Sequence, residues 1–188
     1  MPEIRAAQLK EDLLALSELG SELASRVLAD LAPATLRRIV LATRVDWLPA
    51  ELNVELAHVG ERVLGEDGLR TWGRASVLRS MGTSLLQPIL EGAVRLFGLS
   101  PPAIFRTVPS AYRAAYRNCG EMVVTGGEPD ARIVTLQGLP APLQDHAFLV
   151  AIEGALEGVF DTCRVEGAVR LVSPIGERVE FRASWRPR

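Results

Sequence analysis

The sequence predicts an α+β fold, in which an N-terminal layer of helices packs on an antiparallel sheet built from two β-hairpins. Two observations predict it. Apolar residues recur at helical spacing as far as Gly120, and beyond it they alternate with polar residues, as they do in half-buried strands. We therefore expect a single domain over residues 1–188, mainly helical over 1–118 and in ββαββ order over 119–188. An apolar fraction of 48% with 23% charged residues agrees with a globular chain.

The helical part opens with leucines spaced for two helices over residues 9–31, which Gly20 separates. A short third helix is expected over 35–43. A fourth starts at Pro49, because proline suits the first helical position, where a backbone N–H has no partner in any case.

Further helices are expected before Gly120. One covers residues 69–81, and the next, over 85–97, is apolar around most of its circumference, which predicts a central helix. The pairs Ser100-Pro101 and Val108-Pro109 are typical of helix starts.

The strands are expected as two hairpins with a long helix over 143–161 between them. The first hairpin turns at residues 126–130, which contain two glycines and a proline. The second is the clearer one, because residues 165, 167, 169 and 171 alternate with the charged residues 164, 166 and 170, and residues 179, 181, 183 and 185 alternate with the charged residues 178, 180 and 182. We expect the four strands over 121–125 and 131–137, then over 165–171 and 178–185.

Charge is nearly balanced, with 21 basic and 23 acidic residues and a net charge of −2. No block of like charge could grip a phosphate backbone, which disfavours nucleic acid as a partner. The N-terminus lacks the apolar stretch of an export signal, and charges interrupt every hydrophobic run before it could span a membrane. The sequence therefore predicts a cytoplasmic protein without a membrane span.

Catalytic motifs are missing from the sequence. Lys10 is the only lysine, which excludes a phosphate-binding loop of the Gly-Lys-Ser/Thr type. His58 is expected on a solvated helix face. His146 shares a helix edge with Glu153 and Glu157, but these would need acids from another element to form an acid–base or metal site. We expect neither an enzyme nor a metal or cofactor site.

The chain contains two cysteines, Cys119 and Cys163. In a cytoplasmic chain, two distant thiols are more often reduced core residues than a disulfide. We expect both to be free.

Small residues gather on one face of the long helix over 143–161, namely Ala147, Ala151, Gly154 and Gly158. Such a face permits close approach of another backbone. Its partner is either another helix of the same chain or a second subunit, and the second alternative would make this face a dimer interface.

Aromatic and guanidinium groups concentrate at residues 105–113, around an expected helix start. Backbone N–H groups at such a start can bind an anion or another ligand. The alternative is a rigid turn in which Tyr112 packs inward.

Several motifs together resemble those of a myxobacterial paralogous family of unknown function. They are the pair Phe105-Arg106 followed by Pro109 and by Tyr112-Arg113, then Gly120, the turn Gly138-Leu139-Pro140 and the segment 153–158. The resemblance covers residues 30–186 and brings no established activity with it.

The order of helices followed by ββαββ is similar to a wider fold group, which includes haem nitric-oxide-binding domains, four-vinyl-reductase-type small-ligand domains and TRAPP trafficking-complex subunits. In the haem-binding relatives a proximal histidine holds the iron and a Tyr-x-Ser-x-Arg motif holds the propionates. Here residues 112–117 lack that spacing and no histidine lies between His58 and His146, so we expect no haem. The four-vinyl-reductase-type relatives imply a small ligand held between helices and sheet.

Two functions remain open, and both are non-enzymatic. The first is a regulatory or protein-interaction module, a homodimer or bound to a protein partner, which the small-residue face supports. The alternative is a small-molecule sensor that binds an apolar or anionic ligand between helices and sheet. The side chains expected to bind such a ligand, unless they fill the core instead, are Trp72, Phe105, Arg106, Tyr112, Arg113, Met122 and Phe148.

Overall fold

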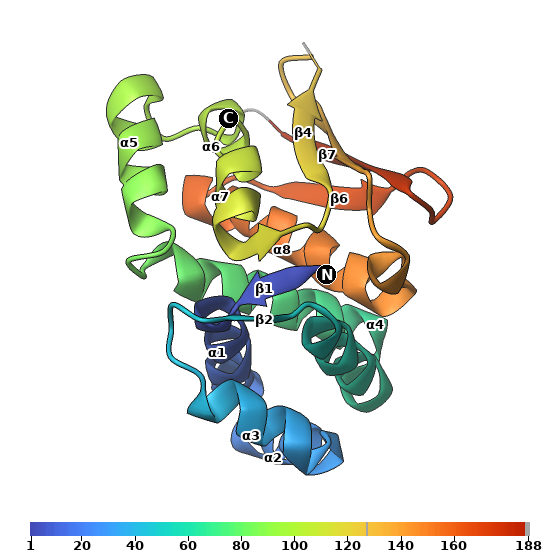
Figure 1. Ribbon diagram of the computed structural model, residues 1–188. Coiled ribbons are helices and arrows are strands. Elements are labelled where there is room, and N and C mark those ends of the chain that lie inside the picture. The colour runs from blue at the N-terminus through green and yellow to red at the C-terminus, as the bar shows by residue number, and fades with distance from the viewer. Residues whose placement is uncertain (127, 187–188) are drawn as a thin grey trace.

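Figure 1 shows the computed structural model of the chain, which describes residues 1–126 and 128–186. Gly127 of the first expected hairpin turn and the last two residues of the expected domain lie outside the described residues. The fold is α+β with antiparallel sheets, as the sequence predicts.

The N-terminal third forms a helical lobe at the bottom of Figure 1. Its elements are α1 (Ala6–Ala15), η1 (Leu16–Leu19), α2 (Ser21–Asp30) and α3 (Pro33–Leu41). Gly20 ends the first helical stretch with a φ of 102°, a conformation that L side chains rarely adopt, so the predicted break at this glycine is confirmed.

A small three-stranded sheet joins this lobe to the rest of the chain and was not predicted. Its strands, in the order β2-β1-β3, are β1 (Glu3–Arg5), β2 (Trp47–Pro49) and β3 (Tyr116–Arg117). Strands of two or three residues are too short to show an alternating pattern, so the sequence carried no signal for them.

Two long helices form the middle of the molecule, α4 (Glu51–Met81) and α8 (His146–Cys163). The two helices predicted before and over 69–81 both form, and α4 contains them on either side of Gly65, whose φ of 73° is not helical. The predicted start at Pro49 is wrong, because Pro49 ends β2 and the helix begins at Glu51. Asp145 begins α8 by accepting a hydrogen bond from the Phe148 backbone N–H at 3.0 Å.

The main sheet has the strand order β4-β5-β7-β6 and contains both predicted hairpins. Its strands are β4 (Glu121–Thr125), β5 (Ala131–Gln137), β6 (Gly167–Leu171) and β7 (Arg178–Trp185). The predicted alternation holds along β7, where Val179 and Phe181 are fully buried while Arg178 and Arg182 are exposed. The short helix η2 (Ala141–Leu143) follows β5.

Three helices lie beside the sheet, α5 (Gln87–Phe97), α6 (Pro101–Phe105) and α7 (Val108–Ala115). The prediction that the apolar helix over 85–97 is central is wrong. α5 lies at the outside of the molecule in Figure 1, and Leu96 and Phe97 are 73% and 52% exposed. The central helices are α4 and α8.

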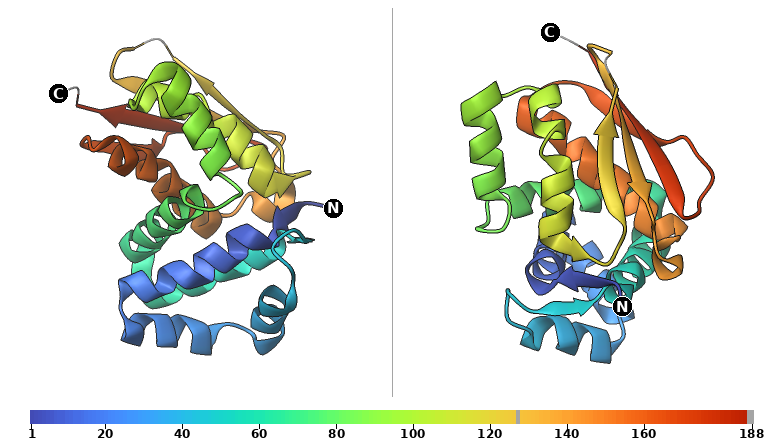
Figure 2. Two further views of the ribbon diagram at one scale, coloured as in Figure 1. Left: turned by 90° about the vertical axis from the view of Figure 1, so that its left-hand side faces the viewer. Right: turned by 45° about the horizontal axis from the view of Figure 1, so that its top comes forward.

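The layers stack as in the left view of Figure 2, with the sheet and α5–α7 above α8, then α4 with α1, then α2 and α3. α8 packs on β6 and β7, α7 packs on β4, and α4 packs on α8. One hydrophobic cluster lies between the sheet and α6–α8, and a second lies among α1–α4 and the buried side of α8. Among the described residues, no helix is long and apolar enough to cross a membrane.

Candidate functional site

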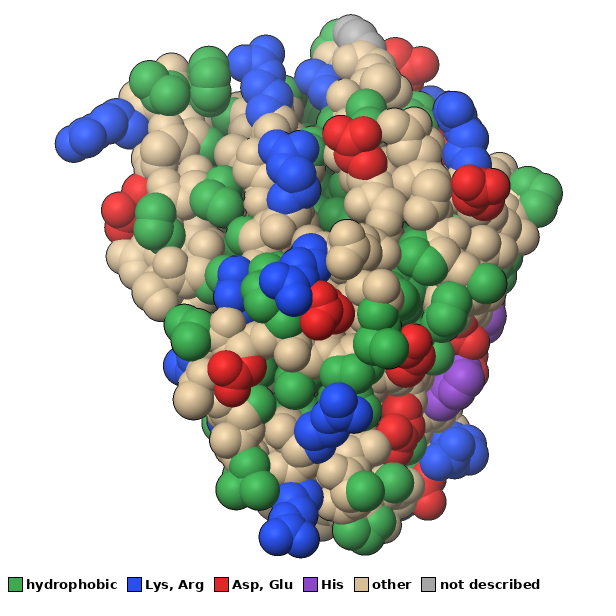
Figure 3. Space-filling model, viewed as in Figure 1, with side chains coloured by type: hydrophobic (Ala, Val, Ile, Leu, Met, Phe, Trp, Pro, Cys, Tyr) green, Lys and Arg blue, Asp and Glu red, His purple; other side chains and the backbone are tan. Residues whose placement is uncertain are grey.

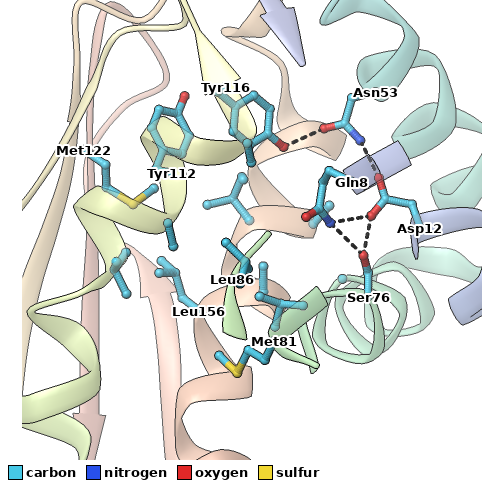
Figure 4. A pocket seen from close by; sticks show the side chains of 18 of the residues that line it. Gln8, Asp12, Asn53, Ser76, Met81, Leu86, Tyr112, Tyr116, Met122 and Leu156 are labelled. Carbon is cyan, nitrogen blue, oxygen red and sulfur yellow. Dashed lines mark hydrogen bonds between the residues drawn. The ribbon is translucent and has the colours of Figure 1, made fainter. Parts of the chain in front are cut away.

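A cavity of about 150 Å³ lies where α4, α5, α7 and α8 meet, beside β4. Figure 4 shows its lining from close by. Most of this lining is apolar, with Met81, Leu86, Tyr112, Met122 and Leu156 among the side chains that face the space. Phe148 belongs to the same lining. An apolar cavity of about this size stays dry and holds a molecule the size of benzene.

The floor of the cavity is the contact between α4 and α8, where the two backbones touch. A Cβ atom on Gly73 would overlap the Ala151 carbonyl, and one on Gly154 would overlap the Arg70 carbonyl. Because the helices already touch, they cannot move closer together to fill the space above them.

Two stacked tyrosines form one wall of the cavity. The rings of Tyr112 and Tyr116 lie 4.7 Å apart between centroids. The Tyr112 hydroxyl donates to the backbone carbonyl of Cys119 at 2.9 Å, and the Tyr116 hydroxyl donates to Asn53 Oδ1 at 2.9 Å. Both hydroxyls are therefore engaged, and the rings are held in place from both ends.

The end of the cavity nearest α1 is polar and centres on Asp12, as Figure 4 shows. Gln8 Nε2 donates to Asp12 Oδ1 at 2.9 Å, and the Ser76 hydroxyl donates to the same oxygen. Asn53 Nδ2 donates to Asp12 Oδ2 at 3.2 Å. Because Tyr116 donates to Asn53 in turn, the tyrosine wall and the carboxylate belong to one hydrogen-bonded chain.

Asp12 is buried without a basic partner. Asp12 is 8% exposed, and no basic side chain among the described residues bonds to its carboxylate. Burial raises the pKa of its carboxyl from 3.8 to about 6, although the bonds from Ser76 and Gln8 act in the opposite direction. The adjacent Glu11 is paired instead, with Arg44 at 2.5 Å and with Arg79 at 3.3 Å.

Four of the seven side chains expected to bind a ligand come together in this cavity. Trp72, Tyr112, Met122 and Phe148 all line it. Trp72 is also fixed from behind, because its Nε1 donates to the Asp12 backbone carbonyl at 2.7 Å.

The other three expected residues lie elsewhere. Phe105 is fully buried in the sheet-side cluster, stacked on Trp185 at 5.9 Å, and does not line the cavity. Arg106 and Arg113 are exposed, the first over the Phe97 ring at 5.0 Å. Tyr112 packs inward, as the alternative of a rigid turn expects, and it also lines the cavity.

The small-residue face of α8 is covered by α4 of the same chain. Ala147 is 1% exposed and packs in the N-terminal cluster, and Ala151 and Gly154 meet the α4 backbone. A Cβ on Gly158 would overlap Val77, also on α4. The expectation that this face serves as a dimer interface is thus corrected, because an intramolecular helix already occupies it.

The histidines stand apart from the cavity on the right-hand surface in Figure 3. His58 bonds to Asp145 at 2.7 Å, and it is about half exposed, as is His146. His146 lies 3.8 Å from Glu61 and 3.7 Å from Glu66 on α4. The carboxylates that were expected beside it serve structure instead.

Glu153 is bonded to Arg70 at 2.8 Å and to the Leu171 backbone N–H, and Glu157 accepts from the Val169 N–H at 3.2 Å. Within residues 1–126 and 128–186, no group of three His, Cys, Asp or Glu side chains is placed to hold a metal ion. Both cysteines are free thiols.

The polar end of the cavity was missed by the sequence reasoning. A signal for Asp12 existed, because it lies three residues after Leu9 and four before Leu16, and so on the buried face of its helix. A carboxylate at an apolar helix position is uncommon and points to a buried polar group. Gln8, Asn53 and Ser76 carried no comparable signal, because an uncharged polar residue on a helix is as common on the solvent side as beside a buried group.

The chain has an H-NOX-like fold. It is similar to the Fe(II) unliganded H-NOX protein from K. algicida with a TM-score of 0.61 and 13% identity, covering 98% of each chain. It is also similar to a double variant of the Tt H-NOX protein, with a TM-score of 0.63 and 11% identity over 98% of this chain and 96% of the other. At these identities the likeness establishes the fold alone.

No family model matches the chain, and no curated protein matches its sequence. The resemblance to a myxobacterial family therefore stays a prediction, whereas the wider fold group that includes haem nitric-oxide-binding domains is supported.

The residues that line the cavity do not fit haem. Haem iron needs an axial ligand such as histidine, cysteinate, tyrosinate or methionine. Neither histidine lines the cavity, and neither cysteine does. Met81 and Met122 do line it, but methionine ligates haem iron together with a histidine, which is missing from the lining. The two tyrosine hydroxyls are engaged as donors, and burial raises the pKa of Tyr116 well above its usual range, so neither offers a phenolate. None of the lining side chains is an arginine, lysine or histidine that could pair with a propionate.

Proposed function

We propose that this chain is a non-enzymatic regulatory module that senses a small apolar molecule bound in the cavity between α4, α5, α7 and α8. The observation that carries the proposal is the cavity itself, about 150 Å³ of mostly apolar space above a helix contact that cannot close. An H-NOX-like fold supports it, since the K. algicida and Tt proteins are H-NOX proteins, a name that stands for haem nitric oxide/oxygen binding.

The position of the cavity supports a sensor more than a passive void. It touches α5, whose outer side is exposed, and α8, which packs on the sheet. A ligand that fills the cavity adds contacts to both elements and stabilises the arrangement in which they meet, which is how a bound molecule shifts a conformational equilibrium.

The first function expected from the sequence, a protein-interaction module, loses the observation on which it depended. That function was inferred from the small-residue face of α8, and this face is packed against α4. The sensor is therefore the function that the geometry supports best.

The test is binding of toluene, a probe of the right size, followed by its effect on thermal unfolding. At ten times its Kd, a ligand stabilises the folded state by about 1.4 kcal/mol, which raises Tm by about 3–6 °C in a chain of this length. An Ala155→Leu variant, which adds a side chain inside the cavity from α8, should fold and lose the shift. Ala29→Leu on the exposed face of α2 is the matched control and should keep it.

Absence of any toluene effect on the wild-type protein would contradict the proposal. So would an unchanged shift in Ala155→Leu, because the ligand would then bind elsewhere.

A further inference from the structure

The end of the cavity at Asp12 is polar, and a purely apolar ligand makes no hydrogen bond there. Asp12 is the single charged side chain among the described residues that line it, and 8% of this residue is exposed. The remaining lining is apolar or neutral. A buried carboxylate beside an apolar space is costly unless a partner compensates its charge.

Asp12 has room for one more hydrogen bond. A carboxylate has about four acceptor positions on its two oxygens. Oδ1 accepts from Gln8 and from Ser76, whereas Oδ2 accepts from Asn53 alone. A further donor therefore finds a free acceptor position on Oδ2 without displacing a protein group.

The groups around Asp12 leave its charge uncompensated. Glu11 on α1 is the nearest other acid, and Arg44 and Arg79 already pair with it. From α4 come the neutral Asn53 and Ser76. From β3 comes Tyr116, whose pKa is raised well above its usual range, so it is neutral as well.

We infer that the ligand is a primary amine, and this inference rests on the proposed function. The apolar body of the ligand, about the size of one aromatic ring, lies in the cavity, and its ammonium group donates to Asp12 Oδ2. An ammonium group supplies both of the things that Asp12 lacks, a donor and a positive charge. A neutral alcohol supplies the donor only, and a carboxylate ligand is repelled.

The test compares benzylamine with toluene, benzyl alcohol and benzoate by isothermal titration calorimetry at pH 7.5. The amine is expected to bind at least about tenfold more tightly than toluene, since a hydrogen bond to a charged group is worth about 1.5–3 kcal/mol. Benzyl alcohol is expected between the two, and benzoate is expected not to bind.

The preference should also depend on pH and on Asp12 itself. The pKa of Asp12 is about 6, so lowering the pH from 7.5 to 5 should weaken amine binding about tenfold and leave toluene binding unchanged. Asp12→Asn should remove the preference for the amine while still binding toluene, which also proves that this variant folds. Glu18→Gln, an equal change of charge outside the cavity, should keep the preference.

The outcomes separate the two claims. If toluene binds and the amine binds no better, or if the preference survives in Asp12→Asn, the inference of an amine ligand is overturned and the proposed function stands. If none of the four probes binds to the wild-type protein, both are overturned. The pH series uses the wild-type protein alone, so it decides the inference even if Asp12→Asn does not fold.

Discussion

The two ends of the cavity are held in different ways. At the apolar end, packing alone holds side chains such as Leu86, Met122 and Leu156. At the polar end, a hydrogen bond fixes each side chain. Packing sets the volume of a site but tolerates a change of shape, because apolar contacts have no direction. A closed hydrogen-bond network tolerates no lost member without leaving a buried group unpaired. The two ends should therefore control different properties of binding, the first the size of the ligand and the second its polar group.

The largest effect is expected from shortening a side chain at the apolar end. Leu156→Ala removes a side chain that is 5% exposed and should cost about 2–5 kcal/mol of the free energy of unfolding, measured by urea titration. It also enlarges the cavity, so naphthalene, too large for about 150 Å³, should bind to the variant and not to the wild-type protein.

The matched change at the polar end is Ser76→Ala, which deletes one hydroxyl and leaves the apolar volume nearly unchanged. The set of hydrocarbons that bind should stay the same in this variant. If naphthalene bound to both variants alike, the division of the site into a size-setting end and a polar end would be wrong.

A smaller effect of about 3 kcal/mol is expected from the pH dependence of Asp12. Its pKa is raised in the folded state from 3.8 to about 6, so the folded protein binds this proton more tightly than the unfolded chain does. The stability that comes from this proton is therefore present in full below about pH 4 and is lost as the pH rises through about 6, a total of about 3 kcal/mol.

Asp12→Asn has no such proton, so its difference from the wild-type protein isolates the effect. Between pH 3 and pH 7 the wild-type free energy of unfolding should fall by about 3 kcal/mol relative to that of the variant. A difference that stays constant over this range would mean that the carboxylate is not buried as described.

The sequence predicts the fold well where an element is long and one of its faces is buried. The strands β4, β5 and β7 and the break at Gly20 follow from their patterns because the alternation or the glycine is decisive locally. The prediction from sequence fails for α5. A helix that is apolar around most of its circumference is predicted to be central, whether or not other elements cover it. Which helix lies outermost is decided by the competition of all helices for the core, and no single segment records it.

The candidate site is predicted in part for the same reason. Aromatic and sulfur side chains such as Trp72, Met122 and Phe148 are recognisable from the sequence as buried groups. That they surround a space rather than touch one another depends on the closeness of α4 and α8, which Gly73 and Gly154 set from different parts of the chain. The network around Asp12 joins α1, α4 and β3, and such a meeting of distant residues has no local signature.

The space where α4, α5, α7 and α8 meet should admit small apolar molecules, and a crystal of the protein pressurised with xenon tests this directly. Xenon occupies dry apolar cavities of about this size. We expect one strong anomalous peak between Met81, Met122 and Leu156. The account would be contradicted if side chains filled that space, or if xenon bound only at the surface.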